Sequence, residues 1–440
     1  MSEPGGASAH RFEHVATGVP GPRSRALAAR LARCEAPGVT YLGAEYPVFW
    51  ESARGALVID ADGNRYLDLT SAFGVATTGH TNPAVGAALA AQAGRLVHGM
   101  GDVHPTEVRL RLLEALAALA PGELSKTYLA TSGAEAVEFA LKTALLATGK
   151  PRVLAYRGAY HGLSLGALEV AGIDKFVDPF APLVAQRATL LPYPGADTTA
   201  ARALADARAA LARDPGIGAI VVEPVQGRGG VIVPPAGWLR GLRALCDERG
   251  ALLIVDEIYT GFGRTGRLFA CEREEVVPDL LCVGKALAGG VPIAATIGTP
   301  RAIGAWPPSA GEALHTSTFL GNPLACAAAL ANLDEVRRLG IVDRVRAMEP
   351  WLRERLQVLR RYARVRDVRG IGFLWAVEFA DGGFANRVVV RGLARGLILL
   401  QSGPTGTSIT LAPPVTIDDE QLARALDLFE ATVRACEEEP

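Results

Sequence analysis

The chain has 440 residues, of which 49% are hydrophobic and 21% are charged, and its formal net charge is −1. This is the composition of a soluble globular protein large enough for two domains. The near-zero charge gives no indication of nucleic acid or an anionic membrane as partner, and no run of about 18 apolar residues predicts a membrane-spanning helix. Six scattered cysteines without a C-x-x-C pair argue against a metal site or a disulfide framework and favour a cytoplasmic location.

The first predicted elements lie near the N-terminus. Residues 1–25 are rich in Gly, Pro, Ala and Ser and have no apolar run, which predicts a flexible lead-in and not a signal peptide. Residues 56–71 (ALVIDADGNRYLDLTS) predict a hairpin that turns at Asp62-Gly63-Asn64. We assign residues 26–85 to the N-terminal part of a smaller domain.

The middle of the chain alternates short β-rich runs with longer helical patterns such as 133–148 and 236–249. Several of the runs are nearly continuous Val, Ile and Leu, as expected of parallel strands buried on both faces. This pattern predicts a large α/β domain over residues 86–330, and the mixed pattern that follows predicts a smaller α+β domain ending with residues 331–440. The predicted strands are TYLAT (127–131), RVLAYR (152–157), GAIVVEP (218–224), ALLIVDE (251–257) and DLLCVGK (279–285).

Lysine is rare in this chain: five of its 45 basic residues are lysines. Arginine can replace lysine on a surface but cannot form a Schiff base. Lys285 follows the apolar run LLCVG, where burial would lower the pKa of its amine towards the nucleophilic form. A lysine that merely extends to solvent at the end of a strand is the alternative.

Two further positions fit a site at the ends of these strands. Asp256 ends the run ALLIVD, where open α/β sheets place ligand-binding groups, although a loop carboxylate is an equal alternative. Residues 131–134 (Thr-Ser-Gly-Ala) join a strand to a helix, and their backbone N–H groups could approach a phosphate. Residues 261–266 (GFGRTG) match the dinucleotide-binding pattern, but no clear helix period follows, so a nicotinamide-dependent dehydrogenase is only a remote alternative.

The order and spacing of six motifs closely resemble the class III aminotransferases. They are TSGAEAVE (131–138), YHG (160–162), EPVQGRGG (223–230), DEIYTGFGRTG (256–266), GKALAGG (284–290) and STFLGNPLACAAA (317–329). The resemblance extends from about residue 45 to 435. It implies the fold type I of pyridoxal 5′-phosphate (PLP) enzymes, with a mostly parallel seven-stranded sheet in the large domain, and a homodimer with shared active sites.

The resemblance also implies a role for each matching residue. Lys285 would bind PLP covalently and carry protons, and Asp256 would pair with the pyridine nitrogen. Tyr160 and Ile258 would enclose the ring, and Thr318 would reach the phosphate bound by the neighbouring subunit. The remaining cofactor-binding residues would be Ser132, Gly133, Ala134, Glu223 and Tyr259.

Substrate recognition departs from the family pattern. In many relatives an arginine binds the substrate carboxylate, and this chain has Thr410 at that position. In the same relatives a glutamate pairs with that arginine, and this chain has Arg228 at the position of the glutamate. A second carboxylate-binding arginine is replaced by Leu163. We hypothesise that Arg228 binds a substrate carboxylate or phosphate; the alternative is that it pairs with an acid such as Asp102. Phe73 is expected to face the substrate, and Asp102 could attract a second amino group or serve as a turn residue.

The sequence therefore predicts a PLP-dependent aminotransferase that moves an amino group from an amine or amino acid to a keto or aldehyde acceptor by a ping-pong mechanism. An aminomutase or racemase of the same fold is the alternative, since it would keep Lys285 and Asp256 while returning nitrogen to one substrate. A decarboxylase is less favoured, because Phe73 offers no polar group to assist loss of a carboxylate.

Overall fold

The computed structural model describes residues 11–195 and 197–438. Its largest sheet has seven strands, and only β10 runs antiparallel to its two neighbours. The predicted mostly parallel seven-stranded sheet is therefore confirmed. In spatial order the strands are β4 (Lys126–Ala130), β10 (Ala294–Gly298), β9 (Leu280–Val283), β8 (Leu252–Asp256), β7 (Ile217–Val222), β5 (Arg152–Tyr156) and β6 (Ala188–Leu191).

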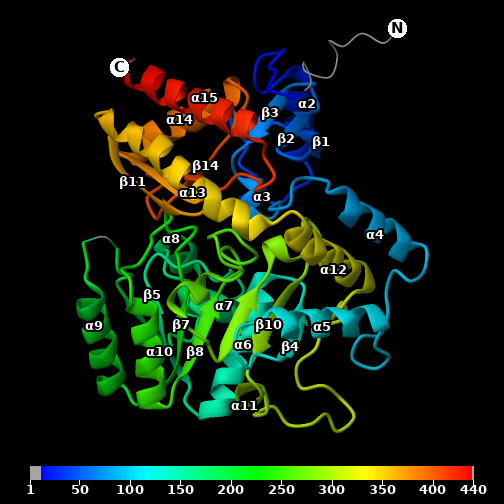
Figure 1. Cartoon of the computed structure of the whole chain (residues 1–440), viewed down its shortest axis with the longest axis vertical. Coiled ribbons are helices and arrows are strands. Elements are labelled where there is room, and N and C mark those ends of the chain that lie inside the picture. The colour runs from blue at the N-terminus through cyan, green and yellow to red at the C-terminus, as the bar shows by residue number, and fades with distance from the viewer. Residues whose placement is uncertain (1–10, 196, 439–440) are drawn as a thin grey trace.

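Burial explains the composition of these strands. Every residue of β7, β8 and β9 is buried, because helices cover the sheet on both sides (Figure 1). Parallel strands end at the same edge of a sheet, so the residues that follow β7, β8 and β9 are brought together there. The covering helices include α5 (Glu107–Leu119), α6 (Gly133–Thr148), α9 (Ala200–Arg213) and α10 (Trp238–Arg249).

The N- and C-terminal segments of the described chain both lie in the upper part of the molecule (Figure 1). The predicted hairpin is formed by β2 (Leu57–Asp60) and β3 (Arg65–Asp68), which pair antiparallel. On its other side β3 pairs in parallel with β13 (Leu397–Ile398), so N- and C-terminal segments share one sheet. That sheet begins with β1 (Trp50–Arg54), and a second four-stranded sheet contains β11 (Val365–Ile371), β12 (Leu374–Phe379), β15 (Ser408–Leu411) and β14 (Leu400–Ser402).

We propose the domain division expected from the sequence, in which residues 86–330 form the larger domain and 26–85 combine with 331–440. Helix α12 (Pro323–Arg338) runs through residue 330 and would connect the two. The smaller domain is covered by α13 (Ile341–Gln357), α14 (Gly382–Ala394) and α15 (Asp419–Glu438).

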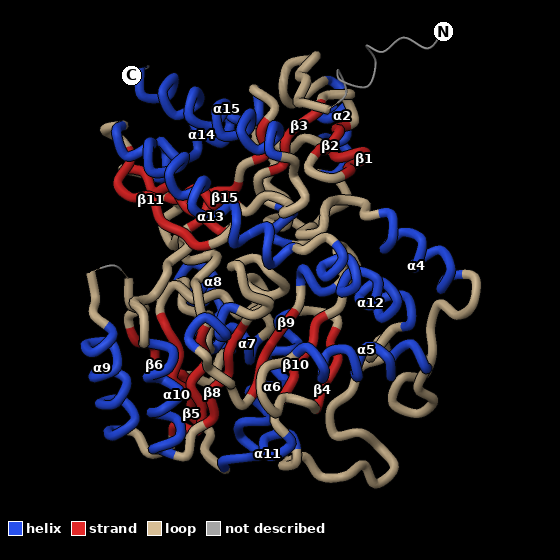
Figure 2. The backbone as a smooth tube through the Cα atoms, viewed as in Figure 1, coloured by secondary structure: helices blue, strands red, loops and turns tan. Residues whose placement is uncertain are grey.

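Shorter helices and loops join these layers (Figure 2). In the described part of the chain, no helix is both long and apolar enough to cross a membrane. The remaining helices are α2 (Pro22–Leu31), α3 (Ser71–Gly74), α4 (Pro83–Ala93), α7 (Leu165–Glu169), α8 (Asp174–Val177) and α11 (Pro300–Ile303), with 3-10 helices η1 (Asp178–Leu183), η2 (Ala270–Glu274), η3 (Lys285–Leu287) and η4 (Val358–Arg361).

The predicted N-terminal lead-in lies partly outside the described residues, which begin at residue 11. Its later part packs on the hairpin. The backbone of His14 exchanges hydrogen bonds of 3.0 and 2.9 Å with that of Arg65, and the side chain of Asn64 accepts from the N–H groups of Ala16 and Thr17. Ser24 is fully buried. These contacts give residues 14–24 fixed positions.

Candidate active site

Lys285 begins η3 immediately after β9 and Gly284. Its φ of 42° lies in the left-handed region, which is costly for a residue with a side chain and is most often retained at functional sites. The Nζ atom lies 4.6 Å from the centre of the Tyr259 ring. Burial lowers the pKa of Lys285 below its usual 10.5, against the opposing charges of Asp256 and Glu223. A larger share of neutral, nucleophilic amine follows.

Asp256 ends β8 and is 4% exposed. Its Oδ2 lies 2.7 Å from Nδ1 of His161, and its Oδ1 accepts a 2.9 Å hydrogen bond from the N–H of Ile258. Burial by itself would lower the pKa of His161, but the hydrogen bond and charge of Asp256 outweigh it and raise that pKa above 6.5. The carboxylate is therefore held in one orientation by two donors.

A second buried carboxylate, Glu223, follows β7. It accepts hydrogen bonds from the N–H groups of Tyr160 (3.0 Å) and Gly227 (2.9 Å). Burial raises the pKa of Glu223 above its usual 4.5. Glu223 thus ties the loop that carries Tyr160 to the turn that carries Arg228.

The predicted phosphate loop lies at the N-terminus of α6. The Oγ of Ser132 caps this helix by accepting a 3.2 Å hydrogen bond from the N–H of Glu135. A Cβ on Gly133 would lie 2.7 Å from Cδ1 of Ile258, so only glycine fits there without a shift. The first N–H groups of a helix have no partner within it and favour an anion, so Gly133 and Ala134 are suited to a phosphate.

Two cavities meet at Lys285, Tyr160 and Ile258. The first, of about 340 Å³, is lined by Phe73, Tyr160, Phe176, Glu223, Gly227, Arg228, Asp256, Ile258, Tyr259, Lys285, Leu400, Ser402 and Thr410. The second, of about 460 Å³, contains the helix N-terminus and is lined by Val75, Thr131, Ser132, Gly133, Ala134, Tyr160, His161, Gly162, Leu163, Ile258, Lys285 and Gly290 to Ile293. Together they offer space for a cofactor with a phosphate and for a substrate beside it.

Most of the residues predicted from the sequence line one of these cavities. Two do not. Thr318 is exposed, and Asp102 accepts a 2.9 Å hydrogen bond from Thr316 Oγ1. The alternative pairing of Arg228 with Asp102 is not found, since no ion pair joins them in the described residues.

Several site residues were missed in the sequence. His161 lies within the YHG motif, but the sequence analysis assigned a role in cofactor binding only to its neighbour Tyr160. Phe176, Leu400 and Ser402 also line the first cavity. Leu400 and Ser402 come from β14, more than 100 residues after Lys285, and no local pattern marks them.

The GFGRTG segment does not open a dinucleotide-binding helix. Arg264 within it is fully buried and donates to Thr77 Oγ1 (2.9 Å) and to the carbonyl oxygens of Phe373 and Pro413. The short η2 follows it. The segment thus joins distant parts of the chain, and this geometry gives no support to the dehydrogenase alternative.

A lysine and two carboxylates lie together at the ends of parallel strands, the edge at which open α/β sheets bind their ligands. Comparison with known families matches residues 41–433 to "Aminotransferase class-III". The chain belongs to the class III aminotransferases, and it is an aminotransferase.

Relatives and solved structures agree with this family. The chain is 38% identical to a 4-aminobutyrate aminotransferase of Mycobacterium leprae, over 96% of this chain and 98% of the relative. It is 39% identical to a putrescine aminotransferase of Pectobacterium atrosepticum, over 87% and 82%. Among solved structures, the ornithine aminotransferase from Toxoplasma gondii ME49 aligns with a TM-score of 0.84 at 31% identity, covering 95% of this chain and 96% of that one.

Proposed function

We propose that this aminotransferase binds PLP through Lys285 and transfers an amino group from an amine or amino acid to a keto acid or aldehyde. The observation that carries the proposal is the position of Lys285 where the two cavities meet, with a lowered amine pKa. Named relatives act on an amino acid and on a diamine, which supports amines and amino acids as the donor class.

The residues present fit this cofactor. Gly133 and Ala134, with Ser132, would hold the phosphate at the N-terminus of α6, and Tyr160 and Ile258 would lie against the two ring faces. Asp256 would hold the pyridine nitrogen, and Glu223 and Tyr259 would lie beside the ring. Burial raises the pKa of Tyr259 to about 12, so its hydroxyl stays protonated and can donate a hydrogen bond.

Bound PLP supplies an aldehyde carbon for amines and an aromatic ring that takes up electron density. The protein's own part is to manage protons and charge. Lys285, once its amine is free and neutral, can remove a proton from the carbon that bears the substrate nitrogen. The protonated amine can then act as the acid that donates a proton in the next step. His161 holds the carboxylate of Asp256 in place through their 2.7 Å contact, and Asp256 would pair with the protonated ring nitrogen of the cofactor.

The test is the visible spectrum of the purified protein with PLP, followed by addition of candidate amines with no acceptor. We expect the wild type to show the visible absorption band of PLP bound to a lysine. The band should disappear when a suitable amine is added and return when a keto acid follows. Lys285→Ala should lack the band. A Lys285→Ala spectrum like that of the wild type would refute the proposal, and a product formed without any acceptor would indicate an aminomutase.

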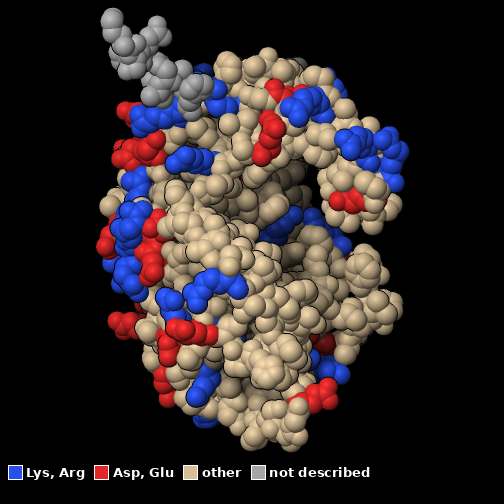
Figure 3. Space-filling model, turned by 90° about the vertical axis from the view of Figure 1, so that its right-hand side faces the viewer, with Lys and Arg blue, Asp and Glu red and all other residues tan. Residues whose placement is uncertain are grey.

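We further propose a homodimer in which Thr318 of one subunit reaches the phosphate bound by the other. One side of the molecule has a broad area with few charged side chains (Figure 3), and exposed apolar residues occur in two segments, 96–110 and 314–319. They are Leu96, Val97, Met100, Val103, Leu110, Leu314 and Phe319. Large exposed apolar surfaces of this kind mark interfaces.

Sedimentation of the wild type and of Val97→Glu tests this assembly. We expect a dimer for the wild type and a shift towards monomer, with weaker PLP binding, for the variant. A monomeric wild type would contradict the proposal. We also propose a cytoplasmic location, because all six cysteines are free thiols, five of them buried.

A further inference from the structure

Arg228 brings a positive charge into the first cavity, which it lines together with Lys285. Its side chain is half-buried, and its Nη1 donates a 3.3 Å hydrogen bond to the carbonyl oxygen of Gln401. Within the described residues, no carboxylate forms an ion pair with it. Burial lowers the pKa of Arg228 below its ordinary value, but a guanidinium remains charged at any physiological pH.

The acids of the same cavity are engaged elsewhere. Glu223 accepts from the backbone of Tyr160 and Gly227, and Asp256 accepts from His161 and Ile258. Neither lies within ion-pair distance of Arg228 in the described structure. A half-buried cation without an acid partner is costly, so an anion that entered this cavity would be stabilised by Arg228.

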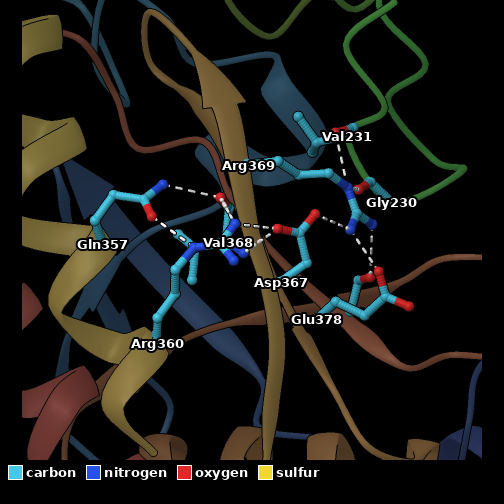
Figure 4. Close-up of polar contacts among 9 residues, drawn as sticks. Gly230, Val231, Gln357, Arg360, Asp367, Val368, Arg369 and Glu378 are labelled. Atoms are coloured by element: carbon cyan, nitrogen blue, oxygen red, sulfur yellow. Dashed lines mark hydrogen bonds and ion pairs between the residues drawn. The ribbon is translucent and has the colours of Figure 1, made fainter. Parts of the chain in front are cut away.

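The backbone around Arg228 is held in place by the C-terminal part of the chain. The carbonyl oxygen of Arg228 accepts a 3.0 Å hydrogen bond from the N–H of Gly403. Gly230 and Val231, which follow Arg228 closely in the chain, are held in the same way. Their carbonyl oxygens accept hydrogen bonds of 3.0 and 3.2 Å from Arg369 Nε. Asp367 and Glu378 in turn hold the Arg369 guanidinium (Figure 4). These contacts hold the backbone that carries Arg228 at the cavity wall.

A second cation, Lys175, contacts a residue of the cavity wall. Lys175 in α8 places its Nζ 4.9 Å from the ring centre of Phe176, which lines the cavity. Burial and then the charge of Arg228 lower the pKa of Lys175. Ser402 and Thr410 add hydroxyl groups to the same wall, joined by a 2.7 Å hydrogen bond. This end of the cavity therefore combines unbalanced positive charge with hydrogen-bonding groups.

We propose that Arg228 is a permanent receptor for an oxyanion, a carboxylate or a phosphonate-like group, at the end of the substrate away from the reacting amine. Its planar guanidinium suits two parallel hydrogen bonds to such a group. Because the cavity contains no acid that neutralises Arg228 when the oxyanion is absent, both the amino donor and the oxo acceptor carry this group. The inference rests on the proposed function, since it concerns the substrates of the same cavity.

The kinetic test compares ω-amino acids of two to six carbons with alkylamines of equal length, and oxo acids with the matching aldehydes. The holoenzymes compared are the wild type, Arg228→Met, Arg228→Lys and the surface control Arg202→Met. We expect the wild type to prefer the acids. Arg228→Met should raise KM for acids about tenfold to a hundredfold without raising KM for the neutral compounds. The KM of Arg228→Lys for acids should lie between those of the wild type and Arg228→Met, and the KM of Arg202→Met should match that of the wild type.

Binding of glutarate, which has no amine to react, gives a second measurement. Calorimetry should detect binding to the wild type and at least tenfold weaker binding to Arg228→Met. Aminoalkylphosphonates that outperform amino acids would identify a phosphate-like group as the oxyanion. Equal KM changes for acids and neutral compounds, or a wild type that uses alkylamines as well as amino acids, would overturn the proposal. Failure of the cofactor assignment would appear separately, as a missing absorption band in the wild type.

Discussion

Nδ1 of His161 lies 2.7 Å from Oδ2 of Asp256, and both side chains are almost completely buried. Nε2 of His161 has no hydrogen-bond partner in the described structure, so this ring is directed mainly at one carboxylate. The pair links the YHG loop to the end of β8 and fixes the carboxylate that we assign to the cofactor nitrogen.

This pair predicts a pH-dependent stability. Because Asp256 raises the pKa of His161 above 6.5, the stabilisation is complete below pH 6.5 and is lost as the pH rises through the pKa in the folded protein. His161→Asn should lower the free energy of unfolding by about 3 kcal/mol at low pH, because it leaves a buried charge without its partner. Urea unfolding of the cofactor-free protein between pH 6 and 9 measures this, and a difference that does not shrink with pH would contradict it.

Lys285 predicts a pH dependence of cofactor uptake. Only the neutral amine is nucleophilic, so the rate of PLP binding should rise with pH and level off near the pKa of Lys285. Burial lowers that pKa below 10.5, which places the plateau at lower pH than for a free lysine. Stopped-flow absorbance with cofactor-free protein measures the rate, and a rate still rising at pH 10.5 would contradict the expectation.

Gly133 predicts a steric effect on the cofactor site. In Gly133→Ala the new Cβ would lie 2.7 Å from Cδ1 of Ile258, and displacement of Ile258 should weaken PLP binding about tenfold. Gly86→Ala is the control, because nothing lies within 4 Å of a Cβ there. Fluorescence titration with PLP measures both, and unchanged affinity in Gly133→Ala would show that Ile258 adjusts without cost.

The turn that carries Phe73 into the cavity contains three successive left-handed residues with side chains: Ser71, Ala72 and Phe73, with φ of 49°, 47° and 65°. Ala72→Gly should increase the free energy of unfolding by about 0.5 kcal/mol, because it removes a left-handed penalty of about 1–2 kcal/mol at an entropic cost of about 0.5–1 kcal/mol. Ala205→Gly, at an exposed position in α9, should instead destabilise by about 1 kcal/mol. Thermal unfolding compares the two variants with the wild type. If both substitutions destabilise the protein, the backbone strain inferred at Ala72 is contradicted.

The sequence by itself determined the α/β class, the main strands and the positions of Lys285 and Asp256, because continuous apolar runs report strands buried on both faces and polar residues at their ends stand out. The family followed from motifs spread over the chain. Local patterns carried no information on which distant side chains meet, since that depends on strand order and on packing between the two ends of the chain.

Only the tertiary structure decided the rest of the site. It placed His161 against Asp256 and brought Leu400 and Ser402 of β14 to the cavity that contains Lys285. It also placed Asp102 beside Thr316 and left Arg228 without an acid in the described structure. The partner of a charged side chain is set by three-dimensional proximity, so the sequence could name Arg228 but could not tell whether its charge is balanced.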